Sequence, residues 1–217
     1  MDITVMIGAL FEGLGFSAWI FVVTLVGSIP LGVVVALCRL SKFKPLALIA
    51  RFYISILRGT PLMLQLMAFM FAPYALFGMN MGTDWKFGAC ALGFILNYSA
   101  YFAEIYRSGI QSIPRGQYEA AQVLGYSSTQ TFMKIILPQV IKVILPAMSN
   151  EVIVLIKDTS LAFVLGVAEM FSVAKSLAAS EVSMIPYAIA ALIYWVFCLI
   201  IEFVMGRIEK KMNYYQS

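Results

Sequence analysis

The 217-residue sequence contains no histidine, three cysteines and few charged side chains. Without histidine, imidazole general-base catalysis and histidine-containing zinc sites are excluded. Cys38, Cys90 and Cys198 lie in apolar stretches without the spacing of a metal motif or a disulfide framework, which indicates a packing role. The sequence also lacks G-x-x-x-x-G-K-[ST] and any Gly-Lys pair, so an ATP-driven activity would need a separate ATPase chain.

Charged residues make up 12% of the chain and hydrophobic residues 62%, and the mean hydropathy is +0.90. A soluble domain is roughly one quarter charged and half apolar, so this composition indicates an integral membrane protein. The first 15 residues carry Asp2 and Glu12 but no Lys or Arg, and thus lack the basic region of a cleaved signal peptide. We expect the first hydrophobic run to remain as a membrane anchor.

A helix needs about 20 apolar residues to cross a bilayer, and the chain offers five such windows. They lie near residues 15–38, 54–77, 86–106, 145–168 and 186–206. We expect helices throughout, because isolated strands cannot satisfy their backbone groups in lipid and the alternation of a membrane barrel does not occur. The predicted fold class is an all-α integral membrane protein, with a single domain over residues 1–217.

Lysine and arginine gather after alternate spans. They are Arg39, Lys42, Lys44 and Arg51 after the first span, Arg107, Arg115, Lys134 and Lys142 after the third, and Arg207, Lys210 and Lys211 after the fifth. The other loops hold only Lys86 and Lys175. The positive-inside rule then predicts an N-terminus outside the cell and a cytoplasmic C-terminus, with the segment 115–138 on the cytoplasmic side.

The segment 115–138 reads as two short helices joined by a turn. Residues 117–124 are good helix formers, Gly125 can adopt a left-handed conformation, and Ser127 with Gln130 resembles a capping box. A second helix is predicted over 128–137, ending at Pro138. Its apolar side chains Phe132, Ile135 and Ile136 form a face that needs a packing partner.

DNA binding is one interpretation of such a unit. Affinity for DNA depends on neutralising phosphates, and the predicted second helix carries a single cation, Lys134. We therefore reject nucleic acid as a ligand and favour a protein partner at the cytoplasmic face.

Three blocks of sequence carry a family resemblance. They are "LRGTPLMLQL" at 57–66, "AYFAEIYRSGIQSIPRGQYEAAQVLG" at 100–125 and "LPAMSNEVIVLIKDTSLAFVLG" at 145–166. Together they resemble the histidine, glutamine and arginine uptake group of permeases in ATP-binding-cassette (ABC) importers, over nearly the whole chain. Ser108 stands where this family pattern has glycine. The resemblance implies the type I ABC importer permease fold, in the cytoplasmic (inner) membrane of a bacterium.

The resemblance also implies the partners. Residues 115–138, here called the coupling segment, would be the EAA loop that fits a groove of the ATPase, through Glu119, Ala120, Ala121 and Gly125. The chain itself would be no enzyme and bind no cofactor, because ATP and Mg²⁺ would be held by two copies of a partner ATPase. Five helices are few for enclosing a path, so a second permease chain, identical or related, is expected. A binding protein would deliver the amino acid at the outer face.

Polar residues within the third and fourth spans are candidates for the substrate path, because polarity in lipid is costly. In the third span Asn97, Tyr101 and Glu104 share one helical face, which also includes Ser108. Glu104 could alternatively pair with Arg107, three residues further on. Asn97 and Tyr101 could equally form interhelical hydrogen bonds. The candidates in the fourth span are Asn150, Lys157, Asp158, Thr159 and Ser160.

Within the fourth span Glu151 shares a face with Asp158, and Asn150 with Lys157. Asp158 or Thr159 could instead cap a restarted half-helix. A second break is predicted at Arg58-Gly59-Thr60-Pro61, with Thr60 as an N-cap, Pro61 as the first helical residue and Gln65 one turn inside. Such a helix start could attract a substrate carboxylate, or the break could be a kink that steers the chain into the membrane.

For an amino acid substrate, Glu104 and Asp158 are the candidates for its cationic end, and Asn97, Asn150, Thr159 and Ser160 could orient the rest. Two acids favour a basic amino acid such as arginine, lysine or histidine, with glutamine or glutamate as the alternative. The expected mechanism is alternating access driven by the partner ATPases. An ion-coupled carrier would use the same acids but transport without an ATPase, and an intramembrane hydrolase would turn substrate over as the purified chain alone.

Overall fold

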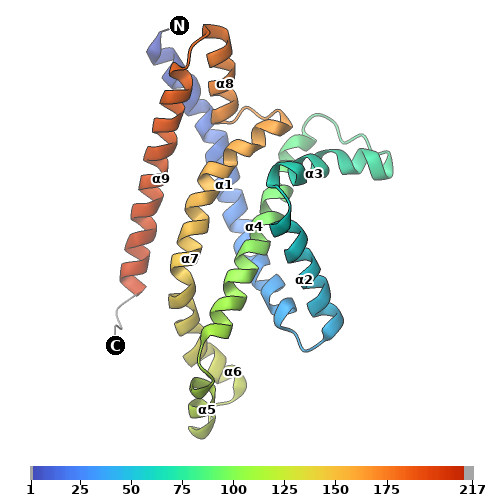
Figure 1. Ribbon diagram of the computed structural model, residues 1–217, viewed down its shortest axis with the longest axis vertical. Helices are drawn as coiled ribbons and strands as arrows, with labels where there is room; N and C mark the ends of the chain where they lie inside the picture. The colour runs from blue at the N-terminus through green and yellow to red at the C-terminus, as the bar shows by residue number, and fades with distance from the viewer. Residues whose placement is uncertain (1, 213–217) are drawn as a thin grey trace.

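The computed structural model describes residues 2–212, which form helices and, within that range, no strand. The long helices are α1 (Ile3–Leu40), α4 (Trp85–Ser112), α7 (Leu137–Asp158) and α9 (Ile185–Met212). The shorter ones are α2 (Lys44–Gly59), α3 (Leu62–Phe77), α5 (Arg115–Val123), α6 (Ser128–Thr131) and α8 (Met170–Glu181). A π-helical turn, η1 (Phe132–Ile136), precedes α7, and a 3-10 helix, η2 (Thr159–Leu165), follows it. The long helices run lengthwise, and α5 and α6 project at one end (Figure 1).

Three helical runs within residues 2–212 are long and apolar enough to cross a membrane. They are α1, the continuous run Ser128–Leu165, and α9. The pair α2 and α3 meets the same test only when counted together, because each helix is 16 residues long, and the two bend by 112° at the break between them. The window 54–77 is therefore divided between two helices, and the count of five spans stays a prediction.

The core of the bundle lies around α4. Phe94, Tyr98 and Phe102 of α4 are almost completely buried, and they belong to one cluster with Leu155 and Ile156 of α7. Helix α1 packs closely along α4, because its Gly32 lies so near Phe102 that a Cβ atom added there would come within 2.9 Å of the phenylalanine Cβ. This packing fixes the positions of α4 and α7, the two helices that carry most of the predicted path residues.

The second helix of the coupling segment does not end at Pro138, and that prediction is wrong. The run Ser128–Leu165 continues through Pro138 because the preceding turn is π-helical, with the Leu137 N–H donating to the Phe132 carbonyl. Pro138 then falls in the first turn of α7, where a missing N–H costs little. The second helix of the coupling segment and α7 are consequently one uninterrupted helical rod, and α5 precedes this rod across the turn at Gly125.

The break at residues 58–61 also differs in detail from the prediction. Thr60 is the C-cap of α2 and Pro61 is the N-cap of α3, so α3 begins at Leu62, one residue later than expected. Pro61 has an extended backbone, with φ −61° and ψ 132°. The Thr60 hydroxyl donates to the Ile56 carbonyl at 2.9 Å instead of capping α3.

At the other end of the molecule, the fully buried Glu169 caps α8. Its carboxylate accepts hydrogen bonds from the N–H groups of Phe171 and Ser172, each at 2.6 Å, and a longer one from the Tyr194 hydroxyl of α9 at 3.4 Å. The Ser17 hydroxyl of α1 accepts from the Met170 N–H at 3.3 Å. Glu169 thus joins α8 to α9, and Ser17 joins α8 to α1.

The loop between α1 and α2, the coupling segment and the last turn of α9 lie at the same end of the molecule (Figure 1). These are the parts of the chain that carry the alternating clusters of Lys and Arg. This arrangement agrees with the expected topology, and the orientation in the membrane stays a prediction.

Candidate functional site

The structure brings together six side chains from three elements into what we call the charged face. They are Arg58 of α2, Tyr98, Tyr101 and Glu104 of α4, and Glu151 and Asp158 of α7. The Arg58 guanidinium carbon lies 5.1 Å from the centre of the Tyr101 ring, a cation–π distance. The Tyr98 hydroxyl donates to Asp158 Oδ2 at 2.7 Å. Arg58 and Asp158 are both within electrostatic reach of Glu151.

Glu104 has a local partner, as the alternative prediction allowed. The Arg107 Nε donates to Glu104 Oε2 at 2.9 Å, and the Arg107 NH2 group pairs with Glu104 Oε1. Arg107 is also hydrogen bonded to Gln111. The charge of Glu104 is therefore already matched, and a role for Glu104 in the path stays a prediction.

Asp158 and Glu151 differ from Glu104 in their partners. Asp158 accepts its hydrogen bond from a neutral phenol, and its neighbour Lys157 lines a cavity between α7, α8 and α9. A carboxylate that is held by a neutral donor keeps its charge available for a cation. The pair Glu151 and Asp158 is the strongest candidate on this chain for contact with a positively charged group.

At the bend between α2 and α3, which we call the elbow (residues 57–65), the buried Asn97 and Gln65 form a polar network with the exposed Thr60. Asn97 is 4% exposed and Gln65 7% exposed. The Asn97 Nδ2 donates to Gln65 Oε1 and to the Leu57 carbonyl, each at 2.9 Å. The alternative prediction of interhelical hydrogen bonding by Asn97 is therefore confirmed.

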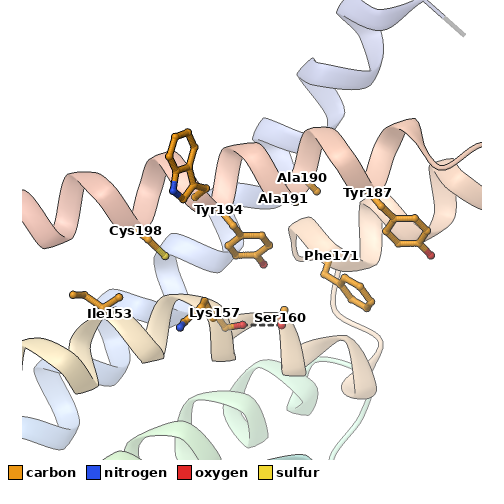
Figure 2. Close-up of a pocket in the computed structure, with 10 residues that line it drawn as sticks. Ile153, Lys157, Ser160, Phe171, Tyr187, Ala190, Ala191, Tyr194 and Cys198 are labelled. Atoms are coloured by element: carbon orange, nitrogen blue, oxygen red, sulfur yellow. Dashed lines mark hydrogen bonds between the residues drawn. The ribbon is translucent and has the colours of Figure 1, made fainter.

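Lys157 and Ser160 line a cavity of about 600 Å³ between α7, α8 and α9 (Figure 2). Its other walls include Phe171, Tyr187 and Trp195. Among the described residues that line this cavity, Lys157 is the charged one. The Ser160 hydroxyl donates to the Lys157 carbonyl at 2.7 Å.

The remaining two candidates of the fourth span are Thr159 and Asn150, and neither belongs to the charged face. Thr159 is buried and its hydroxyl donates to the Ile156 carbonyl at 2.7 Å, while Asn150 is exposed on α7. Neither Asp158 nor Thr159 caps a restarted helix, because η2 continues α7 directly and has no side-chain cap.

The coupling segment has the predicted local structure at its turn. Gly125 has φ +78°, the Tyr126 N–H donates to the Ala121 carbonyl at 3.1 Å, and the Gly125 N–H donates to the Gln122 carbonyl at 3.0 Å. These are the two hydrogen bonds of a Schellman motif, which needs a left-handed residue at this position. In the capping box the Ser127 N–H donates to Gln130 Oε1 and the Gln130 N–H donates to Ser127 Oγ. The predicted helix end at Gly125 and the predicted helix start at Ser127 are therefore both confirmed.

The exposed surface of the coupling segment is apolar beside an acid. Val123 is 88% exposed and Leu124 74% exposed, while Glu119 and Ala120 are also exposed. Ala121, one of the four residues expected to fit the ATPase groove, is only 1% exposed and packs within the chain. Apolar side chains exposed beyond the membrane-crossing helices indicate a docking surface for protein.

The sequence predictions missed several residues of these two sites. Tyr98 could have been found from its spacing to Tyr101, one helical turn away. Glu151 is absent from the predicted path residues although it shares the Asp158 face. Val123 and Leu124 are absent from the predicted coupling residues, and the packing of the chain shows that both are exposed.

Known proteins resemble this chain in sequence and in fold. Residues 28–214 match the family described as "Binding-protein-dependent transport system inner membrane component". The chain is 38% identical over 203 residues to the arginine transport system permease protein ArtQ of Bacillus subtilis (strain 168), covering 93% of this chain and 91% of that protein. It is 36% identical over 206 residues to the L-cystine transport system permease protein TcyB of the same organism, covering 94% and 86%.

A solved structure described as "Crystal structure of an amino acid ABC transporter with histidines" matches with a TM-score of 0.86 at 33% identity, covering 97% of this chain and 99% of that chain. The helical fold and the exposed coupling segment thus define a membrane-embedded permease subunit. The chain belongs to the family of inner membrane components of binding-protein-dependent transport systems. Within it, the chain is the non-catalytic permease subunit of an amino acid ABC importer with the type I fold, and its ATPase is a separate subunit.

The hydrogen bond between Tyr98 and Asp158 can be tested with Tyr98→Phe. Removing the hydroxyl leaves Asp158 without its fixed donor, so we expect the KM of amino acid uptake to rise by roughly tenfold, the value of one hydrogen bond to a charged group. Uptake by reconstituted transporter measures this. Tyr106→Phe is the matched control, because that hydroxyl makes only a 3.4 Å contact with the Ile29 carbonyl. Equal KM values for the two variants would contradict a path role for Asp158.

Proposed function

We propose that this chain forms the translocation path for a polar amino acid, with a basic side chain favoured over a neutral one. The observation that supports this is the charged face, where Glu151 lies within electrostatic reach of Arg58 and Asp158, and where Asp158 accepts a hydrogen bond from the neutral Tyr98. An amino acid needs acceptors for its ammonium group and a donor for its carboxylate. The two acids would receive the cationic end, and Arg58 would receive the carboxylate.

The preference for a basic side chain follows from the number of acids. A neutral amino acid brings one ammonium group, which one carboxylate can receive, whereas arginine, lysine or protonated histidine brings a second positive charge. Glu151 and Asp158 are seven residues apart on one face of α7 and could hold both charges. Glutamine or glutamate is the alternative substrate, for which the second acid would have no partner.

The coupling segment would receive the closing motion of the ATPase. Val123 and Leu124 would enter an apolar groove of that partner, and Glu119 would accept a charged hydrogen bond beside them. Because the second helix of the coupling segment and α7 form one helical rod as far as Asp158, a displacement of α5 that is passed on through the turn at Gly125 would move α7. This continuity supports a lever that runs from Ser128 to Asp158.

The proposed assembly contains two permease chains, identical or related, and two ATPase subunits that hold ATP and Mg²⁺. An extracytoplasmic binding protein would deliver the amino acid at the outer face. The coupling segment and the C-terminus would lie in the cytoplasm and the N-terminus outside, in the cytoplasmic membrane of a bacterium. The path would open alternately to the two sides as the ATPases close and separate.

Substrate choice can be tested with Asp158→Asn and Glu151→Gln. Each change keeps the shape of the side chain and removes one charge, so we expect the KM for arginine to rise by roughly tenfold or more and that for glutamine to change much less. Competition of unlabelled arginine, lysine, cystine and glutamine against labelled arginine measures the preference. Glu181→Gln, at the exposed end of α8, is the control. A similar loss for arginine and glutamine would refute recognition of the side-chain charge.

Coupling can be tested with Glu119→Arg and with Val123→Ser combined with Leu124→Ser. Both remove features of the proposed docking surface while the Schellman and capping-box hydrogen bonds remain. We expect the ATPase to be lost on purification and ATP-dependent uptake to fall by at least tenfold, as for a desolvated interface contact. Asp84→Arg, an equal change of charge outside the coupling segment, should keep the ATPase bound. Full uptake in the coupling variants would mean that the segment is only a packed loop.

A further inference from the structure

Among the backbone carbonyls that the elbow leaves without helical donors are those of Leu57 and Thr60. In an unbroken helix the Leu57 carbonyl would accept from the N–H of residue 61, but residue 61 is proline and has none. The Thr60 carbonyl would accept from the Leu64 N–H, which donates instead to Pro61 at 3.1 Å. A carbonyl without a donor in an apolar environment is costly, so both need other partners.

The two orphaned carbonyls are satisfied by side-chain amides. The Gln65 Nε2 lies 2.9 Å from the Leu57 carbonyl, 3.0 Å from the Thr60 carbonyl and 2.8 Å from Thr60 Oγ1, and its two hydrogens are shared among them. The Asn97 Nδ2 of α4 donates to the same Leu57 carbonyl and to Gln65 Oε1. One buried network therefore joins the end of α2, the start of α3 and the middle of α4.

Arg58 lies between these carbonyls in the chain. Its backbone is held on one side through Leu57 and on the other through Thr60, and its guanidinium rests on Tyr101, one turn along α4 from Asn97. Helix α4 thus fixes both the backbone near Arg58 and the direction of its side chain. An arginine on an unsupported bend would lose this orientation, because its long side chain has many rotamers.

We propose that the Gln65 and Asn97 amides make the α2–α3 bend a rigid elbow that positions Arg58 at the charged face, and that this bend does not act as a hinge during transport. Gln65 and Asn97 are positioning residues, which act on the substrate through Arg58. The positioning role rests on the proposed function of the charged face, whereas the rigidity of the bend does not. The network thereby identifies a part of the permease that we expect to keep its shape while the path opens to one side and then to the other.

Gly59, two residues before Pro61, would suggest a hinge, but the backbone conformation and surroundings of Gly59 argue against a hinge there. Gly59 is not among the glycines with positive φ, and a Cβ atom added to it would meet nothing within 4 Å. The conformational freedom of glycine is therefore not used here. Gly59→Ala should leave the bend and the uptake rate unchanged within about twofold, because alanine fits this conformation without strain.

Rigidity can be measured with two spin labels on a variant in which the three native cysteines are replaced by alanine. Labels at Leu48 of α2 and Phe71 of α3 are at exposed positions on the two arms of the elbow. In the complete transporter complex we expect the distance between the two labels of one chain to give one narrow peak that is the same without nucleotide and with ATP and vanadate. A distribution that shifts between these two states would overturn the proposal, because the bend would then be a hinge.

The amides are tested with Gln65→Leu and Asn97→Asp in the same labelled complex. Both remove donors to the Leu57 carbonyl, so we expect the distance distribution to broaden while the complex still elutes as one species. If neither variant altered the distribution, the amides would not hold the bend. Asn80→Asp, which makes the same chemical change in the exposed loop after α3, is the matched control and should leave the distribution narrow.

Uptake kinetics separate positioning from a general loss of stability. Because the network acts through Arg58, Gln65→Leu should raise the KM for amino acid by roughly tenfold, as expected for one misplaced charge-assisted contact. Vmax at saturating substrate should change by less than about twofold in the same comparison. A fall in Vmax with KM unchanged would show that the elbow does not position a binding group. If the wild-type complex transports no amino acid, the proposed function fails, yet the spin-label distances still decide whether the elbow is rigid.

Discussion

Every backbone polar group that is removed from water must find a partner within the protein, and the arrangement of this permease depends on how that need is met at Leu57. Pro61 breaks the helix and deprives the Leu57 carbonyl of its donor. Two side-chain amides replace the donor, and one of them comes from α4. The bend of 112° between α2 and α3 is thereby tied to the central helix of the bundle.

The elbow also explains why a polar network lies beside a charged face without belonging to it. Asn97, Tyr101 and Glu104 share one side of α4. The elbow covers that side at Asn97, whereas Tyr101 meets the Arg58 guanidinium and Glu104 meets Arg107. A single helical face therefore serves as a structural anchor at one turn and as part of the charged face at the next.

The helical rod from the coupling segment to Asp158 gives the fold its second long-range connection. Pro138 has no N–H group to donate within the helix. The helix continues past it because the preceding turn, η1, is π-helical, with the Leu137 N–H donating to the Phe132 carbonyl. The Schellman turn at Gly125 and the capping box at Ser127 hold α5 beside the start of this rod. An ATPase that moves α5 would act on a stiff element whose other end carries the two acids of the charged face.

The sequence predicted the features that depend on local signals. Hydrophobic windows identified the membrane class, and Gly125 with Ser127 and Gln130 identified the turn of the coupling segment, because end signals act within a few residues. The prediction that the helix ends at Pro138 is wrong, since a π-helical turn has no simple sequence signature. The partner of Asn97 and the pairing of Tyr98 with Asp158 depend on helices that are distant in the chain, and spacing along one helix cannot reveal them.

The most direct measurement is ATP-dependent uptake of labelled arginine by proteoliposomes that contain this chain with its co-purified ATPase and binding protein, compared with vesicles that contain this chain alone under an ion gradient. The account predicts uptake only in the complete system, with competition by unlabelled lysine stronger than by glutamine. Uptake by the chain alone under an ion gradient would contradict it, because the path would then be driven without the ATPase.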